Sequence, residues 1–334
     1  MGRVLKAGVV GAGAFGGHHA RKYASLPGVR LEAVFDPHID RAEALAGALG
    51  ARAVEELDRF LDAVDLVAIA SPASSHAAIA MAALRRGKHV YVEKPLADRA
   101  EDAAVLVATA REAGLVLACG HQERAVFRAM GLLDLPEAPV RLEAVRRGTF
   151  ASRNLDVSCV LDLMIHDIDL ALAMALATTG GEPPAVRARG RAEPGPLTDE
   201  AHAELAFAGG MTAVLHASRI ADARERTMRL VFPSGEMRID LLTREVVNTT
   251  PFALNADFAE TPEGRDPLGA SIAAFVAAAR GEAPRPLATG EEAARALAVA
   301  LDVDREAALA PSLASTAKTR PAARRTRGSA RAAR

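Results

Sequence analysis

The chain has 334 residues, 50% hydrophobic and 25% charged, with a formal net charge of −1 at pH 7. This length suits two domains with sizeable cores, and the near-zero charge argues against a general nucleic-acid or membrane surface. Cys119 and Cys159 lack a CxxC partner and lie in apolar runs, so we expect buried thiols, no disulfide and no zinc site. No apolar run of membrane-spanning length and no signal peptide are recognised, which predicts a cytoplasmic protein.

The first predicted element is a buried strand that runs through a tight turn into a helix. It contains three glycines in the spacing G-x-G-x-x-G, namely Gly11, Gly13 and Gly16. At this spacing the first glycine permits the turn, the second lets main chain approach a pyrophosphate, and the third lets helix and strand pack closely. A second apolar run, Leu31 to Phe35, ends at Asp36, whose carboxylate would bind a ribose 2′-hydroxyl and repel a 2′-phosphate. The pattern predicts NAD rather than NADP; the alternative is a glycine turn needed only for packing.

Helices and strands alternate through the first third of the chain. After Asp36 the predicted segments are helix 39–49, helix 57–61, strand 65–70, strand 88–92, helix 98–113 and strand 115–119. Such alternation predicts a parallel sheet that binds its ligands beyond the carboxyl ends of the strands. The candidate binding residues are therefore those that follow each strand, namely Gly11, Asp36, Ser71, Glu93 and His121.

Glu93, Lys94 and Pro95 directly follow a buried strand, where the nicotinamide end of a cofactor would lie. Lys94 is the strongest catalytic candidate of this region. His76 falls in the first turn of the helix after Ser71 and Pro72, near the expected cofactor; the alternative is a capping or solvent-facing histidine. The first domain is placed at residues 1–124.

From Val140 onward, longer alternating runs predict a mostly antiparallel sheet with hairpin turns at 209–210 and 234–235. The predicted strands are 140–149, 185–192, 201–207, 211–219, 227–232 and 236–241. One face of this sheet is a candidate subunit contact, and we expect a homodimer or homotetramer. Two late helices, 271–279 and 291–310, are expected to fold back on the first domain, and the second domain is placed at residues 125–311.

The C-terminal segment from Lys318 to Arg334 carries seven Lys or Arg and no acid. It cannot bury enough apolar surface to become ordered, so residues 312–334 are predicted to be a basic disordered tail. Contact with nucleic acid or anionic lipid is the alternative to a solvated extension.

The helix predicted over Val157 to Ala177 is apolar nearly all round, except for a stripe formed by Asp162, His166 and Asp169. Oxidation of a secondary alcohol needs a proton acceptor, and His166 suits that role. Asp162 would orient the imidazole or bind a neighbouring substrate hydroxyl, and Lys94 would donate to the alcohol oxygen. The alternatives are a satisfied core histidine with salt-bridged aspartates, and a metal bound by the stripe.

These motifs resemble the Gfo/Idh/MocA oxidoreductase family. The resemblance rests on Gly11 to Gly16, Asp36, His76, Gly87 to Pro95, and the aspartate-x3-histidine of Asp162 and His166. It implies an NAD-binding Rossmann domain followed by an α/β domain with an open antiparallel sheet used for oligomerisation. It also implies NAD(P)-dependent oxidation or reduction of a sugar, cyclitol or related hydroxyl, with Lys94, Asp162 and His166 catalytic and Glu93 and Pro95 in the cofactor-side loop.

Within the family, segments 120–124, 160–169 and 217–220 resemble the UDP-N-acetylglucosamine 3-dehydrogenase branch. In that branch the 3-keto sugar nucleotide passes to an aminotransferase, for a diamino sugar of lipid A. Arginines bind a diphosphate bidentately, and surface solvation is the alternative for most of them. The candidate arginines are Arg153, Arg219, Arg224, Arg226 and Arg229.

The sequence thus predicts a doubly wound parallel sheet followed by an α/β domain, acting as an NAD-dependent oxidoreductase of a sugar hydroxyl. The best single candidate is C3 of UDP-N-acetylglucosamine. The alternatives are a free sugar or inositol, a non-catalytic dinucleotide- and sugar-sensing regulator, and redox-neutral chemistry with retained NAD. The predicted cofactor-binding residues are Gly11, Gly13, Ala14, Phe15, Gly16, Asp36, Ser71, Pro72, His76, Glu93, Lys94, Pro95 and Arg124. The predicted substrate-binding residues are Lys94, His121, Arg153, Asp162, His166 and Arg219, and no metal is expected.

Overall fold

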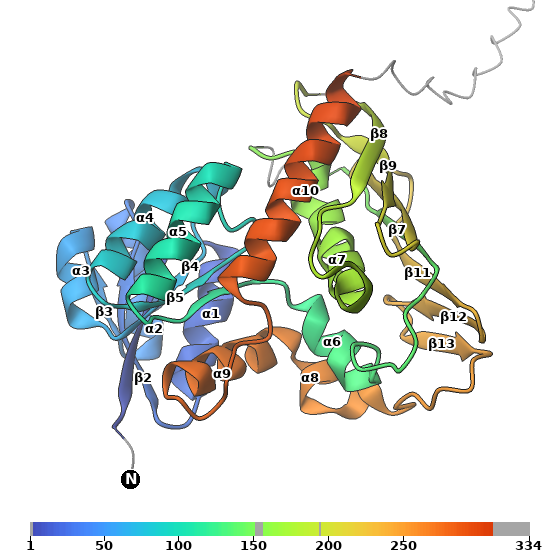
Figure 1. Cartoon of the computed structure of the whole chain (residues 1–334). Coiled ribbons are helices and arrows are strands. Elements are labelled where there is room, and N and C mark those ends of the chain that lie inside the picture. Colours follow the sequence, from blue (N-terminus) through green and yellow to red (C-terminus); the bar gives the residue numbers. More distant parts are fainter. Residues whose placement is uncertain (1–2, 151–155, 194, 310–334) are drawn as a thin grey trace, which may run out of the picture.

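The computed structural model describes residues 3–150, 156–193 and 195–309, and it contains two sheets with helices between and around them (Figure 1). The first sheet has six parallel strands in the order β3-β2-β1-β4-β5-β6. Its strands are β1 (Leu5–Val10), β2 (Val29–Phe35), β3 (Arg52–Val54), β4 (Leu66–Ile69), β5 (His89–Val92) and β6 (Leu117–Cys119). This order is that of a doubly wound dinucleotide-binding sheet, and the predicted fold class of this region is confirmed.

Helices cover both faces of the parallel sheet. On one face lie α1 (Ala14–Ser25), α2 (Ile39–Leu49) and the late helix α9 (Pro267–Ala279). On the other lie α3 (Leu57–Ala63), α4 (Ala73–Arg85) and α5 (Ala100–Glu112). Because both faces are buried, the strands are apolar over most of their length, apart from residues near their starts such as Lys6 and Arg30, which is why the sequence pattern located them. The edge strand β3 was not predicted, since its three residues are only partly buried.

The second sheet has seven strands in the order β13-β12-β11-β7-β10-β9-β8. Only the pair β7 and β10 is parallel, so the predicted, mostly antiparallel sheet is confirmed. The strands are β7 (Arg141–Arg147), β8 (Ala185–Arg191), β9 (Glu200–Ala206), β10 (Thr212–Ser218), β11 (Glu225–Phe232), β12 (Gly235–Asp240) and β13 (Glu245–Asn248). The largely exposed edge strand β13 was missed.

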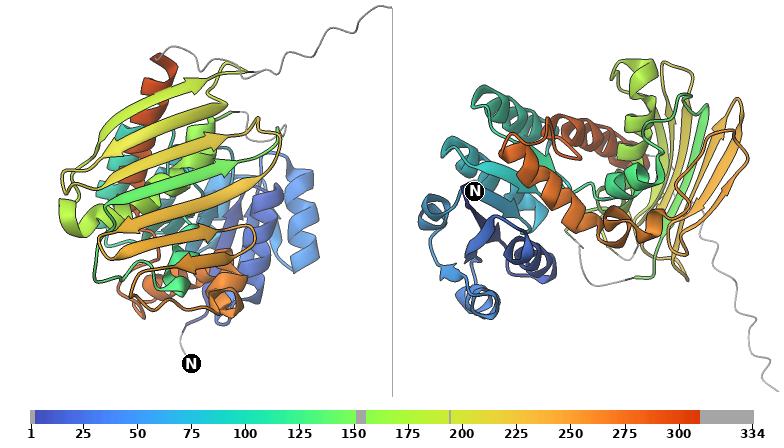
Figure 2. Two further views of the ribbon diagram at one scale, coloured as in Figure 1. Left: turned by 90° about the vertical axis from the view of Figure 1, so that its right-hand side faces the viewer. Right: turned by 90° about the horizontal axis from the view of Figure 1, so that it is seen from below.

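Helices cover only one face of the second sheet, and the other face is open in the described part of the chain (Figure 2). The covering elements are the π-helix η1 (Val160–Met164), α7 (Ile165–Thr179) and α10 (Gly290–Leu309). Short elements complete this side, namely α6 (Glu123–Met130), the 3-10 turn η2 (Phe258–Glu260) and α8 (Pro262–Arg265). The strands alternate accordingly, with Leu142 and Ala144 buried and Arg141 and Glu143 turned outward.

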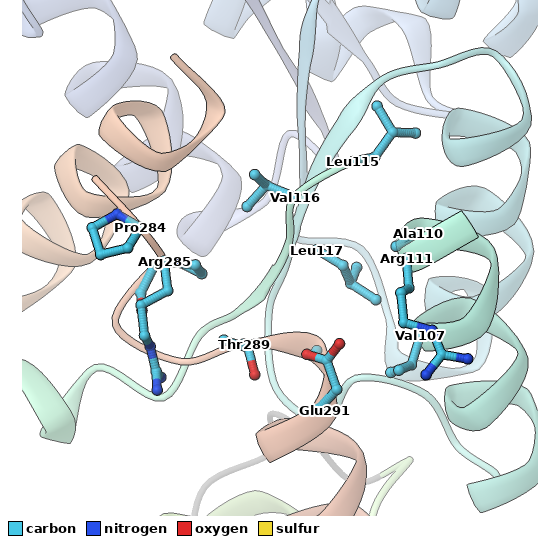
Figure 3. Close-up of a pocket in the computed structure, with 12 residues that line it drawn as sticks. Val107, Ala110, Arg111, Leu115, Val116, Leu117, Pro284, Arg285, Thr289 and Glu291 are labelled. Atoms are coloured by element: carbon cyan, nitrogen blue, oxygen red, sulfur yellow. The ribbon is translucent and has the colours of Figure 1, made fainter. Parts of the chain in front are cut away.

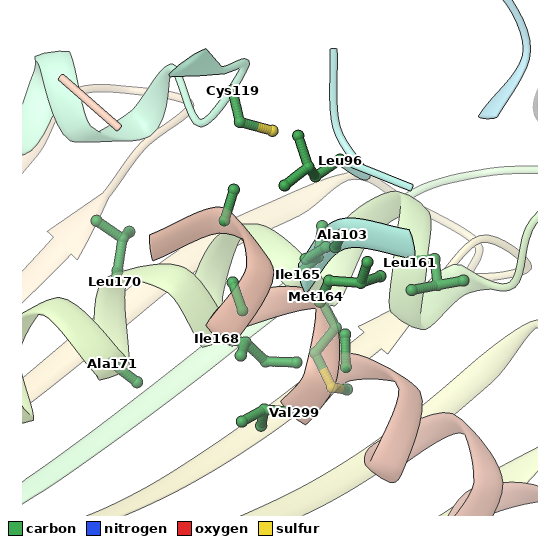
Figure 4. Close-up of a cluster of buried hydrophobic side chains, with 14 of the residues drawn as sticks. Leu96, Ala103, Cys119, Leu161, Met164, Ile165, Ile168, Leu170, Ala171 and Val299 are labelled. Atoms are coloured by element: carbon green, nitrogen blue, oxygen red, sulfur yellow. The ribbon is translucent and has the colours of Figure 1, made fainter. Parts of the chain in front are cut away.

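One continuous apolar core joins the two units. Leu96 and Cys119 of the first unit lie in the same cluster as Met164, Ile168 and Val299 of η1, α7 and α10 (Figure 4). Helix α10 contacts α5 and β6 on one side and α7, η1 and β8 on the other. Each such buried side chain stabilises the fold by about 1.5–3 kcal/mol, so the parallel sheet and helix α7 are held in a fixed relation.

The C-terminal segment, the two cysteines and the hydropathy of the helices were also the subject of predictions. The basic segment 312–334 lies outside the described residues. Cys119 and Cys159 are both buried free thiols, as predicted. None of the helices in residues 3–150, 156–193 and 195–309 combines the length and hydropathy needed to cross a bilayer.

Candidate functional site

The glycine turn after β1 leaves space where a phosphate group would lie. Gly11 has φ +96°, and a Cβ on Gly16 would stand 1.7 Å from the Gly11 carbonyl oxygen, so both positions require glycine. A Cβ on Gly13 would meet nothing within 4 Å. Gly13 also caps α1 without any side-chain hydrogen bond, and Ala14 and Phe15 form the first turn. The N-terminus of α1 therefore presents main-chain N–H groups to open space, which fits a dinucleotide pyrophosphate.

Asp36 lies at the end of β2, against this turn. Its carboxylate accepts the N–H groups of Ala12 and His38, both at 2.8 Å, and it is 7% exposed. These bonds fix the carboxylate beside the glycine turn, at the position where a doubly wound sheet binds the cofactor ribose.

His76 lies between the two loops that are predicted to bind cofactor. One ring nitrogen lies 2.7 Å from the Pro95 carbonyl oxygen and the other 2.9 Å from the Ser71 carbonyl oxygen, and the side chain is 1% exposed. His76 thus ties the loop at Ser71 and Pro72 to the loop at Pro95, and its contact with cofactor stays a prediction.

Lys94 reaches across from the parallel sheet to the second unit. Its Nζ donates to the Asp162 carboxylate at 2.8 Å and to the Asp162 main-chain carbonyl at 2.7 Å. An ammonium has three N–H donors, so two are directed to Asp162. Both side chains are mostly buried, at 14% and 17% exposure.

The neighbouring Glu93 is a buried anion beneath Lys94. The His19 Nε2 lies 2.7 Å from its carboxylate, and Gln122 lies 3.4 Å from the same oxygen. Burial raises the pKa of Glu93, but the hydrogen bond and charge of His19, with Lys94 and His76, outweigh it, so the pKa lies below its usual value. Glu93 therefore supports the loop as an ionised group.

The helix that carries the polar stripe starts as a π-helix, over Val160–Met164, where the sequence predicted a regular α-helix. Single π turns occur frequently at functional sites, because they displace residues from the ordinary 3.6-residue spacing. Asp162 lies in this turn, His166 begins the α-helical part, and Asp169 follows. The stripe faces the carboxyl edge of the parallel sheet, since Lys94, the partner of Asp162, and Arg124, the partner of Asp169, come from that side.

His166 and His121 lie next to each other in the space between the two units. Their ring centroids are 6.1 Å apart. The Nδ1 of His166 and both ring nitrogens of His121 are buried, with no hydrogen-bond partner among the described residues. Buried polar atoms are normally paired, so these nitrogens mark a place where a ligand's polar groups would fit.

The charges around His166 keep its imidazole neutral. Burial lowers its pKa well below the usual 6.5, and the cations Arg146, Lys94 and Arg226 lower it further. Burial also lowers the pKa of His121, against the opposing effect of Asp169. A neutral imidazole close to Lys94 is the state needed to accept a proton.

Arg124 is a buried cation bound by carboxylates, and its contact with cofactor stays a prediction. Its Nε and Nη2 donate to the two Asp169 oxygens at 2.7 and 2.8 Å, and its Nη1 lies 2.8 Å from Glu292. All three nitrogens are thus used by carboxylates, and the residue is 5% exposed. Arg146 pairs in the same way with Asp167, two residues before Asp169 on α7.

The predicted diphosphate-binding arginines separate in the structure. Arg219 is 7% exposed and donates to Asp199 and to the Val157 carbonyl, so it holds the segment before η1, and its role as a substrate ligand stays a prediction. Arg229 pairs with Glu236 and Glu143 on β12 and β7. Arg153 lies outside the described residues.

Arg226 is one of the cations whose charge acts on His166. It is half-buried at the start of β11, directly opposite Arg146, and its charge acts on His166. Burial lowers its pKa, and Arg146 and Arg224 lower it further, against Glu123 and Asp167. Neighbouring like charges of this kind are relieved by an anionic ligand.

A hollow of about 200 Å³ between α5 and the loop before α10 lies apart from this site (Figure 3). It is lined by residues including Val107, Arg111, Leu117, Arg285 and Thr289. None of the predicted site residues lines it, and its mixed apolar and arginine lining carries no paired acid and base.

Comparison with known proteins agrees with this geometry. The family described as "Oxidoreductase family, NAD-binding Rossmann fold" matches residues 5–121, and the "GFO/IDH/MocA C-terminal domain" matches residues 137–238. The chain belongs to the Gfo/Idh/MocA oxidoreductase family. Its resemblance to that family, inferred above from motifs, is therefore confirmed, and so is NAD as the cofactor class.

Two relatives of this family match over most of the chain. The UDP-N-acetylglucosamine 3-dehydrogenase of Acidithiobacillus ferrooxidans is 37% identical over 308 residues, covering 90% of this chain and 96% of its own length. A crystal structure with that name and source has a TM-score of 0.80 and 35% identity, covering 91% of this chain and 98% of its own. The 1,5-anhydro-D-fructose reductase of Ensifer adhaerens is 32% identical, covering 76% of this chain and 80% of its own length. The relatives that match most of this chain are thus named as oxidoreductases of sugars or sugar nucleotides.

Proposed function

We propose that this oxidoreductase oxidises the C3 hydroxyl of UDP-N-acetylglucosamine with NAD. The observation that carries the proposal is the meeting of Lys94 with Asp162, one turn before the neutral His166, at the carboxyl edge of the dinucleotide-binding sheet. The relative named for this reaction, which matches nearly the whole chain, supports the choice of substrate.

The site residues divide the work of alcohol oxidation between the two units. NAD, when bound, accepts the hydride. The Lys94 Nζ donates its remaining N–H to the alcohol oxygen and stabilises the negative charge that develops there. A ring nitrogen of His166 takes the hydroxyl proton, and Asp162 holds the ammonium in place.

A substrate with a diphosphate suits the electrostatics beside His166. Arg146, Arg226 and Lys94 all act to keep His166 unprotonated. A bound anion near Arg226 offsets these cations, which raises the pKa of the imidazole and makes it a better base once the substrate is in place. A neutral free sugar or inositol would lack this effect.

The direct test mixes the protein with NAD and a panel of UDP-N-acetylglucosamine, N-acetylglucosamine, glucose and myo-inositol, and follows the NADH absorbance band. We expect the kcat/KM for UDP-N-acetylglucosamine to be at least about tenfold above that of the other substrates. Tenfold corresponds to the smallest loss expected when a substrate lacks one hydrogen bond to a charged group. Turnover of the free sugars alone would overturn the substrate, and no NADH with any of them would overturn the redox reaction.

The Arg226→Ala variant tests the diphosphate contact. We expect KM for UDP-N-acetylglucosamine to rise by roughly tenfold or more, because a charge-assisted hydrogen bond contributes about 1.5–3 kcal/mol. The matched control is Arg229→Ala, on the same strand but the opposite face of the sheet, where Arg229 pairs with Glu236 and Glu143. An unchanged KM in Arg226→Ala would remove this contact from the proposal.

The remaining parts of the proposal concern the setting of the enzyme. We propose that it works in the cytoplasm as a homodimer or homotetramer that pairs through the open sheet face. Its 3-keto product would pass to an aminotransferase on the route to a lipid A diamino sugar. The bare outer face of the seven-stranded sheet supports the pairing (Figure 2), and light scattering of the purified chain measures it.

A further inference from the structure

The outer face of the seven-stranded sheet carries a group of titratable side chains that the dehydrogenase site does not use. Glu200 and His202 lie two residues apart on β9, and His216 lies on the adjacent strand β10. Their neighbours Ala201 and Ala217 are buried in the core, so the three side chains point to the opposite face. They are therefore separated from η1 and α7 by the thickness of the sheet.

The three side chains converge on one another. His202 and His216 are directly opposite in the antiparallel register, and their rings stack at a centroid distance of 3.8 Å with an interplanar angle of 17°. The His216 Nε2 lies 3.1 Å from the Glu200 Oε1. One ligand atom from each residue lies within 4.8 Å of the others.

This spacing is close to that of a metal site. Zinc binds histidine nitrogen at about 2.0–2.1 Å and carboxylate oxygen at about 2.0–2.2 Å, so two ligand atoms on one tetrahedral ion lie about 3.4 Å apart. The 3.1 Å separation of His216 and Glu200 nearly matches this value. His202 completes the set when the stacked rings turn to direct one nitrogen each toward a shared ion.

The surroundings favour an oriented carboxylate. Arg191 holds the other Glu200 oxygen at 3.0 Å, as an outer-shell partner of a ligating carboxylate does. The nearby Arg147 is paired with Glu225, which offsets its charge.

We propose that Glu200, His202 and His216 bind one zinc-class divalent ion per chain. Two imidazoles and one carboxylate select Zn²⁺, Co²⁺ or Ni²⁺ over Mg²⁺ and Ca²⁺, which prefer all-oxygen sites. The ion links β9 to β10 on the open face. The site is independent of the dehydrogenase reaction, so it stands or fails separately from the proposed function.

The test titrates untagged, chelator-treated full-length protein with Co²⁺ alone, and reads the visible d–d absorption together with calorimetric stoichiometry. We expect one Co²⁺ per chain, displaced by Zn²⁺, and a rise in the thermal midpoint when the ion is bound. In His202→Gln and in His216→Gln the affinity for Co²⁺ falls by at least about tenfold. Tenfold is the smaller loss typical of residues that only support a metal ligand, and these two histidines bind the ion directly. Exposed His38 supplies the control, since His38→Gln keeps one Co²⁺ per chain.

Three results would overturn the site. The first is wild-type protein that takes up no Co²⁺ in stoichiometric amount. The second is uptake that persists unchanged in both histidine variants while their thermal midpoints without metal stay normal. The third is uptake lost equally in His38→Gln, which would indicate nonspecific histidine binding.

Discussion

The two halves of the dehydrogenase site are built in opposite ways. In the parallel sheet the strands are apolar toward their carboxyl ends, and the polar groups Asp36 and Lys94 come in the loops that follow them. On helix α7 the polar groups lie within the core itself, where Asp167 and Asp169 pair with buried arginines. A polar residue in the loop after a buried strand can thus bind a ligand. A polar residue inside a buried helix needs a hydrogen-bond or ion-pair partner from the protein itself.

The largest expected effect breaks a buried pair on the helix side. Arg124→Ala leaves Asp169 as an uncompensated buried charge, so we expect the free energy of unfolding to fall by about 3–5 kcal/mol. Chemical denaturation measures it. The control is Arg305→Ala, whose pair with Asp302 on α10 is exposed and contributes below about 1 kcal/mol. Equal losses in the two variants would contradict the contrast between the halves.

On the loop side, Lys94→Ala should lower kcat by about 10²–10³-fold, because it removes the donor to the developing oxyanion. NAD affinity should change less than tenfold. Calorimetry measures the affinity, since the chain has no tryptophan for a fluorescence titration. Lys88→Ala, at the opposite end of the same strand, is the matched control and should keep full turnover. Retained turnover in Lys94→Ala would exclude its catalytic role.

The glycine turn separates cofactor binding from folding. Gly13→Ala places a methyl group in open space, so we expect the stability of the cofactor-free protein to change by less than about 0.5 kcal/mol. The NAD dissociation constant should rise by roughly tenfold or more, because the methyl group occupies the pyrophosphate position. Gly16→Ala, whose Cβ meets the Gly11 carbonyl, should instead destabilise the fold. Unchanged NAD affinity in Gly13→Ala would move the phosphate site elsewhere.

The smallest effect is a pH dependence of stability. Burial lowers the pKa of His121 and His166, so below about pH 6.5 the unfolded chain takes up protons that the folded chain does not. Stability should therefore fall as the pH drops from 7.5 to 5.5. In His121→Gln this fall should be smaller, as seen from thermal midpoints at the two pH values. An identical fall in both proteins would show that His121 titrates normally.

The same difference between the halves limits what the sequence predicts about each site residue. Residues after parallel strands are expected at one edge of the sheet, because strand ends meet there whatever else surrounds them. His76, Arg124 and Arg219, which the sequence assigns to ligands, also bind the protein's own carbonyls and carboxylates. Residue type alone does not predict such contacts, since an arginine that binds a carboxylate distant in sequence is the same residue type as one that binds a phosphate.

The sequence by itself determined the parallel sheet, the glycine turn, Asp36 and the alternating second sheet, because these depend on local periodicity and on main-chain sterics. Only the tertiary structure decided that Lys94 meets Asp162, that η1 is a π turn, and that His121 lies beside His166. It alone also brought Glu200, His202 and His216 together across two strands. Such contacts join residues far apart in the chain, and their geometry is set by how the two units pack on α10, which no local pattern encodes.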